Sequence, residues 1–170
     1  NEKEKGYIRI SKVYEGNTLH RNDDFTFTVK INGEPYNGYY YIDGVSYKAV
    51  DGGVVIKGGQ TAVIQGGIGQ TFEVVESPDI IYQTEVTASS GITVKKESLK
   101  ATGQFTKNIG EITYTNTMQT SGLYVSKELD AEDFLKDIYA DSNFIFKIET
   151  KNAEEKYIPY QGEYTYYPDK

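Results

Sequence analysis

The sequence predicts an all-β protein, built as a sandwich or barrel of short strands. Val, Ile, Thr, Tyr and Phe, which suit a pleated sheet, make up 67 of its 170 residues, whereas the strong helix formers Ala, Leu and Met make up 13. Its apolar stretches are short and are bounded by Gly, Asn, Asp and Pro. These observations disfavour an all-helical fold and an α/β fold with long crossover helices.

Ten strands are expected from this pattern of short apolar runs and turn residues. They cover residues 6–13, 24–32, 38–42, 46–50, 53–57, 60–65, 70–76, 81–87, 92–96 and 111–117. Glycine pairs at 52–53, 58–59 and 66–67 mark expected hairpin turns. So many strands without intervening helices are typical of a sandwich or barrel.

Charge and composition exclude several classes of function. The formal net charge is -7, which disfavours binding to nucleic acid because phosphates would be repelled. No apolar run reaches the roughly 18 residues of a membrane-spanning helix. The chain opens with Asn-Glu-Lys-Glu-Lys and not with Met or an apolar signal segment, so we expect a mature or trimmed fragment. Cysteine is absent, which excludes disulfides and thiolate chemistry.

An internal repeat suggests that a second, similar domain begins within the chain. Residues 8–12 recur as 123–127, and residues 25–29 recur as 144–148. We therefore expect a first domain over 1–118, a polar joint at 119–122, and a truncated second copy over 123–170. Within that copy, Leu123 and Val125 should face inward, and residues 130–140 could hold a helical turn.

Three expected strands each place one polar side chain on the same face as their apolar residues. The sets are Lys12 with Ile8 and Ile10, Glu76 with Phe72 and Val74, and Asn116 with Ile112 and Tyr114. Two interpretations are consistent with this alternation of side chains between the two faces of a strand, which we call parity. Each polar residue lies near the end of its strand, so all three could be solvated there, with Lys12 reaching outward. Alternatively, the three meet in the core.

A meeting of these three side chains would allow a reaction within the chain. Burial favours the neutral forms of the amine and the carboxyl group. A neutral Lys12 amine could then attack the side-chain amide of Asn116, while Glu76 polarises the carbonyl group and shuttles protons. Ammonia would leave and an amide cross-link would remain, in a single turnover that involves no outside substrate.

No cofactor or metal site is predicted. Residues 66–69 contain three glycines, but a phosphate-binding loop would need a helix after them, and a strand is expected instead. Acidic residues between 130 and 137 lack calcium-loop spacing, and the single histidine has no partner for a zinc site.

Five motifs in order give the sequence a family resemblance. They are Ile-Ser-Lys at 10–12, Phe-x-Phe-x-Val at 25–29, a Gly-Gln segment at 59–64, Phe-x-Val-x-Glu-Ser at 72–77 and Thr-x-Thr-Asn-Thr at 113–117. In this order and spacing, the chain resembles the Cna B-type domains of Gram-positive surface proteins and pilins over residues 6–118, and again over 122–150. Ser77 departs from the usual Thr after the glutamate.

The resemblance implies an immunoglobulin-like β-sandwich whose first and last strands lie side by side. It also implies an isopeptide bond between Lys12 and Asn116, assisted by Glu76. The expected function is that of a stalk or spacer in a secreted adhesin or pilin attached to the Gram-positive cell wall, with no enzymatic action on other molecules. Its expected partners are neighbouring domains or subunits of a surface fibre.

Two further expectations accompany this interpretation. Lys127 matches Lys12, so it is the candidate cross-link lysine of the second copy; its glutamate and asparagine partners would lie past Lys170. The alternative function is adhesion to a host matrix protein or glycan through a sheet face rich in tyrosine, since Tyr buries a large area at low entropy cost.

Overall fold

The computed structural model describes residues 4–16, 22–119, 123, 125–128, 130, 132–133, 135, 138, 142–152, 154–164 and 166. The chain divides into two compact units, Asn1–Thr120 and Ser121–Lys170. In the described part of the chain, no helix is both long and apolar enough to cross a membrane.

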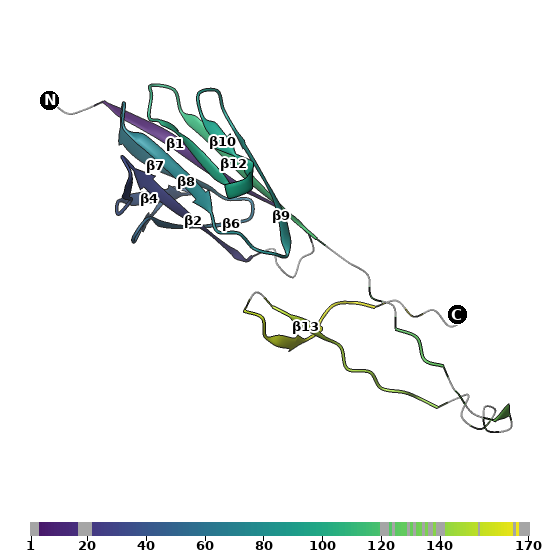
Figure 1. Ribbon diagram of the computed structural model, residues 1–170. Helices are drawn as coiled ribbons and strands as arrows, with labels where there is room; N and C mark the ends of the chain where they lie inside the picture. The colour runs from purple at the N-terminus through teal and green to yellow at the C-terminus, as the bar shows by residue number, and fades with distance from the viewer. Residues whose placement is uncertain are drawn as a thin grey trace. The chain divides into compact units, whose positions relative to one another are not determined.

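The first sheet of unit one has the strand order β5-β4-β7-β1-β12-β9 (Figure 1). Its strands are β1 (Lys5–Glu15), β4 (Tyr39–Ile42), β5 (Val45–Lys48), β7 (Thr61–Gly67), β9 (Tyr82–Ala88) and β12 (Gly110–Met118). β1 and β12 pair in parallel, from Ile8 opposite Gly110 to Glu15 opposite Thr117, whereas the other pairs of this sheet are antiparallel. The first and last strands of the unit are therefore direct neighbours.

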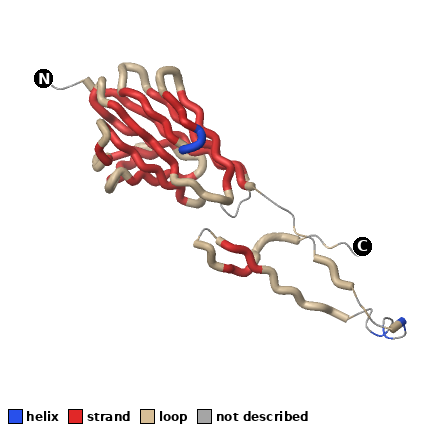
Figure 2. The backbone as a smooth tube through the Cα atoms, in the orientation of Figure 1, coloured by secondary structure: helices blue, strands red, loops and turns tan. Residues whose placement is uncertain are grey.

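The second sheet is antiparallel and has the order β10-β11-β8-β2-β3, with β6 also paired to β2. Its strands are β2 (Asp24–Ile31), β3 (Glu34–Pro35), β6 (Gly53–Lys57), β8 (Thr71–Glu76), β10 (Thr93–Lys95) and β11 (Lys100–Gln104). A short 3-10 helix, η2 (Lys96–Ser98), connects β10 to β11. Strands dominate the unit, as the red segments of Figure 2 show.

The core lies between the two sheets, because alternate residues of each strand point inward. In β1, Ile8 and Ile10 are buried while Tyr7 and Arg9 are not, and in β2 the same alternation buries Phe27. Buried side chains of both sheets form one apolar cluster. The unit is a β-sandwich, which confirms the predicted all-β class.

All ten predicted strands are present, with ends shifted by up to two residues. In unit one the prediction missed β3, which has two residues, and β11, whose one buried apolar side chain is Ala101. Both strands lack the alternation of apolar and polar residues on which the prediction depended.

Two of the three glycine pairs lie at turns, but neither turn closes a hairpin between paired strands, because β6 pairs with β2 in the second sheet whereas β5 and β7 lie in the first. Gly52 and Gly59 adopt φ values of +80° and +83°, which residues with a Cβ rarely adopt. The turn expected at 66–67 is wrong, because both glycines lie within β7 and the turn follows at 68–69. A Cβ at Gly66 would collide with the ring of Phe105, so this glycine serves packing rather than chain reversal.

Unit two contains an antiparallel pair, β13 (Glu149–Lys151) and β14 (Tyr157–Pro159). The expected inward orientation of Leu123 and Val125 is wrong: their exposed fractions are 72% and 52%. Parity can assign two side chains to one face, but no sheet among the described residues of this unit covers that face. Much of the helical turn considered over 130–140, including Phe134, lies outside the described residues.

Candidate functional site: a buried lysine, glutamate and asparagine

Three polar side chains lie inside the apolar core of unit one. Lys12 on β1, Glu76 at the end of β8 and Asn116 on β12 are each 1% exposed, and they are the buried polar residues among those the structure describes. Lys12 and Asn116 come from the two parallel strands of the first sheet, whereas Glu76 comes from the facing sheet. The sandwich thus brings together the three residues that parity places inward.

The carboxylate of Glu76 holds the other two side chains. Lys12 Nζ donates to Glu76 Oε1 and Oε2 at 2.9 and 3.0 Å, and Asn116 Nδ2 donates to Oε1 at 2.8 Å. Because both nitrogens share Oε1, they cannot lie further apart than the sum of those two bonds. The solvated arrangement of three separate strand ends is therefore wrong.

Aromatic rings close the site against water. The ammonium group of Lys12 lies 4.5 Å from the ring centroid of Phe25, a cation–π contact. Phe27, which lies opposite Glu76 in the pairing of β2 with β8, packs edge to face with Tyr114, with centroids 5.0 Å apart. The hydroxyl of Tyr114 lies 3.0 Å from the carbonyl oxygen of Val74, which connects β12 to the facing strand β8.

Burial acts on both ionisable groups in the direction that favours their neutral forms. Desolvation lowers the pKa of Lys12 below its usual value of 10.5, although the contact with Glu76 opposes that shift. Desolvation likewise raises the pKa of Glu76 above 4.5, against the opposing effects of Lys12 and Asn116. The two shifts make transfer of a proton from the ammonium group to the carboxylate easier than in water. The products of that transfer are a nucleophilic amine and a carboxylic acid.

The orientation of the Asn116 amide corrects one part of the sequence interpretation. Glu76 faces the amide nitrogen, so it is placed to exchange protons with the leaving group rather than to polarise the carbonyl group. The amide oxygen instead accepts a hydrogen bond of 2.9 Å from the hydroxyl of Thr84 on β9. The sequence analysis missed Thr84. This residue lies two positions from both Tyr82 and Val86, so it shares the inward face of β9 with them.

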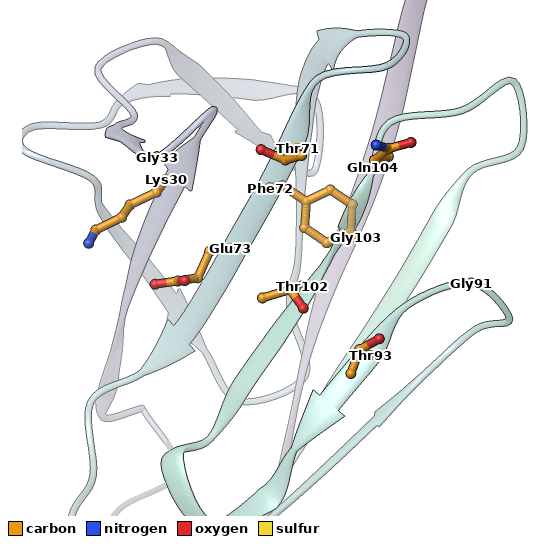
Figure 3. Close-up of a pocket in the computed structure, with 10 residues that line it drawn as sticks. All are labelled: Lys30, Gly33, Thr71, Phe72, Glu73, Gly91, Thr93, Thr102, Gly103 and Gln104. Carbon is orange, nitrogen blue, oxygen red and sulfur yellow. The ribbon is translucent and has the colours of Figure 1, made fainter.

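The side chains that form the site are shielded from solvent, since Lys12, Glu76 and Asn116 are each 1% exposed. A shallow hollow of about 400 Å³ lies over the second sheet and is lined by residues of β2, β8, β10 and β11, including Lys30, Glu73 and Thr102 (Figure 3). None of the three buried polar residues lines it. A molecule bound in this hollow would therefore not contact the three side chains.

Lys127 of unit two shares one contact with its repeat counterpart. Its Nζ lies 4.9 Å from the ring centroid of Phe144, just as Lys12 lies over Phe25, the residue that aligns with Phe144 in the repeat. Unlike Lys12, Lys127 is exposed, and the structure places no carboxamide beside it among the interactions of the described residues.

A family model matches residues 6–118, the span of the sandwich, and its description is "Domain of unknown function (DUF7601)". The chain belongs to the DUF7601 family. This DUF7601 domain contains all of Lys12, Glu76 and Asn116. A comparison with curated protein sequences finds no match.

Solved structures similar to the DUF7601 chain include pilus proteins. The pilus-presented adhesin Spy0125 (Cpa) has a TM-score of 0.52 at 16% identity over 68% of this chain and 27% of the adhesin. The major pilin T-13 of Streptococcus pyogenes has a TM-score of 0.51 at 23% identity, over 68% of this chain and 46% of the pilin. The T3.2 pilin of the same species has a TM-score of 0.52 at 19% identity, over 67% and 45%.

At these identities the similarity is one of fold. The chain spans between about a quarter and a half of the length of these proteins. The β-sandwich of this DUF7601 domain is therefore a fold that pilins and pilus-presented adhesins also contain.

The lowered pKa of Lys12 predicts a pH dependence of stability in a variant that cannot react at residue 116. In Asn116→Ala, unfolded Lys12 keeps its proton up to about pH 10.5, whereas folded Lys12 loses it at lower pH. The free energy of unfolding should therefore rise with pH in the interval below 10.5, by at most about 1.4 kcal/mol per pH unit. Urea unfolding between pH 7 and 10 measures this slope.

The matched control is Asn116→Ala with Lys12→Met, which removes the titrating amine and keeps every other ionisable group. The slope attributed to Lys12 is the difference between the two variants. Equal slopes would show that Lys12 titrates alike in the folded and unfolded states, against the assignment of a desolvated amine.

Proposed function

We propose that residues 6–118 form a Cna B-type spacer domain of a Gram-positive surface fibre or adhesin, closed by an isopeptide bond between Lys12 and Asn116. The observation that carries this proposal is the buried hydrogen-bonded cluster in which one carboxylate contacts both an amine and a carboxamide from neighbouring first and last strands. The order of the five sequence motifs and the fold shared with pilus proteins support the same assignment.

The reaction balances within the three side chains. Glu76 takes a proton from the Lys12 ammonium group, and the neutral Nζ adds to Cγ of Asn116. Glu76 then passes that proton to Nδ2, the bond between Cγ and Nδ2 breaks, and ammonia leaves. The Glu76 carboxylate takes the second proton that Nζ loses on becoming an amide nitrogen, so the products are the amide, ammonia and protonated Glu76. The new amide joins Nζ to Cγ, and no oxidant or cofactor is consumed. Glu76 is the proton shuttle because its oxygens contact both nitrogens.

The bond would join the two ends of the sandwich into one covalent loop of about 100 residues. Closing a loop of this size removes unfolded-state entropy worth about 4–5 kcal/mol, by the loop-closure relation that applies to disulfides. A pulling force that enters at β1 and leaves at β12 would pass through the bond, so the hydrogen-bonded strands would not have to bear it. An amide also resists reduction, unlike a disulfide.

Domains of this kind in series would form a stalk attached to the cell wall, with neighbouring domains or fibre subunits as their partners. Residues 123–170 are then the start of a second such domain, with Lys127 as its cross-link lysine. The shared lysine–phenylalanine contact supports this interpretation of the repeat.

The alternative function, adhesion to a host matrix protein or glycan, is favoured by one observation. Tyr7, Tyr39 and Tyr41 are 39%, 54% and 43% exposed, and their alternation with buried neighbours places them on the outer face of the first sheet. A glycan array and a matrix-protein binding screen distinguish the two functions, because a pure spacer binds nothing and an adhesin loses binding on Tyr39→Ser or Tyr41→Ser.

The intact mass of the purified chain tests the cross-link. The wild-type protein should weigh less than its sequence by the mass of one ammonia molecule, because the reaction expels ammonia and adds nothing. Lys12→Ala, Glu76→Ala and Asn116→Ala should each show the full mass of their own sequence. A wild-type mass equal to the sequence mass would show that the isopeptide bond does not form.

The free energies of unfolding of variants distinguish a single covalent bond from three independent side-chain contacts. Glu76→Ala and Asn116→Ala should each lower the free energy of unfolding by about 4–5 kcal/mol, because each abolishes the bond. The melting temperature should fall by about 15 °C or more. Both values come from thermal unfolding followed by circular dichroism.

The double variant Glu76→Ala/Asn116→Ala is the informative control, because a single bond can be lost only once. Its loss of stability should be well below the sum of the two single losses, because the contribution of the bond is lost only once. Fully additive losses would mean that the side chains act as separate contacts and not through one covalent link.

A further inference from the structure

The hydroxyl group of Thr84 lies against the part of the Asn116 amide that Glu76 does not reach. Thr84 and Asn116 are directly opposite residues of the antiparallel pair β9–β12, and Thr84 Oγ1 donates to Asn116 Oδ1 at 2.9 Å. Thr84 is partly buried and Asn116 is fully buried. The amide is thus held from two sides, its nitrogen by Glu76 and its oxygen by Thr84.

This division matters because the amide oxygen is where negative charge develops. When Nζ of Lys12 adds to Cγ, the electron pair of the carbonyl bond moves onto Oδ1. A donor already aimed at that oxygen stabilises the charge, in the way that the donors of an oxyanion hole do. Glu76 cannot supply this donor in the observed arrangement, because its hydrogen bond is with Nδ2.

We propose that Thr84 is a catalytic residue of the cross-linking reaction, whose hydroxyl group stabilises the oxyanion formed on Asn116 Oδ1. This proposal rests on the isopeptide bond proposed above. The hydroxyl keeps its own proton throughout: it donates a stronger hydrogen bond to the oxyanion, and that bond weakens when the carbonyl group re-forms and ammonia leaves. Proton transfer stays with Glu76, so the two residues have separate tasks.

The chain offers a matched control on the same strand. Thr87 lies opposite Thr113 on β12, on the exposed face of the sheet, three residues from Thr84. Thr87→Val makes the same chemical change as Thr84→Val in the same strand, but away from the amide. It therefore controls for the effect of replacing a strand threonine with valine.

The test follows the rate of ammonia loss. The full 170-residue chain and each variant are made by cell-free translation, samples are quenched in denaturant at intervals, and the cross-linked fraction is measured by intact mass. Thr84→Val should form the bond about tenfold more slowly or worse, since losing one oxyanion donor typically costs about a hundredfold and water can partly replace a half-buried hydroxyl. Thr87→Val should match the wild type, and Thr84→Ser, which keeps the hydroxyl group, should restore most of the rate.

Each result bears on one proposal or the other. A Thr84→Val chain that reacts at the wild-type rate would overturn the role of Thr84 and leave the isopeptide bond in place. A wild-type chain that never loses ammonia would overturn the bond itself, and Thr84 with it. Should Thr84→Val fail to fold by circular dichroism, Thr84→Ala carries the same expectation, and failure of Thr84→Ser to react faster than Thr84→Ala would refute the hydroxyl's role.

Discussion

The structure depends on a carboxylate that accepts hydrogen bonds from both an amine and a carboxamide between two β-sheets. An ionised group in such a place is costly unless it is paired, and removing one partner leaves the other unpaired in an apolar core. Here Glu76 contacts both Lys12 and Asn116, and in the described part of the chain no buried side-chain polar atom lacks a hydrogen-bond partner. The same burial that makes the cluster costly moves both pKa values toward the neutral, reactive forms.

The parallel pairing of β1 with β12 turns this local chemistry into a property of the whole domain. The two strands are distant in sequence but adjacent in the sheet, so a bond between their side chains would enclose nearly the whole sandwich. Their register places Tyr14, not Lys12, opposite Asn116. The long lysine side chain covers this two-residue offset and reaches the carboxylate of the facing sheet.

The sequence predicted the inward face of three strands and therefore the three site residues, because alternation in β1, β8 and β12 is regular. It could not predict how the amide of Asn116 is turned, since parity assigns a face and not a rotamer. Thr84 was overlooked for a related reason: threonine suits any strand, so its place between Tyr82 and Val86 carried no signal without the register of β9 against β12. In unit two, alternation alone misplaced Leu123 and Val125, because burial needs a second surface that a strand pattern does not supply.

Peptide mapping of the wild-type chain tests the central claim most directly, because it identifies which residues are joined, whereas the intact mass shows only that ammonia has been lost. After trypsin digestion, the account predicts one branched peptide that contains residues 12 and 116, lighter by one ammonia than its two linear parts, with no cleavage after Lys12. Two separate linear peptides at their unmodified masses, with trypsin cleaving after Lys12, would contradict it.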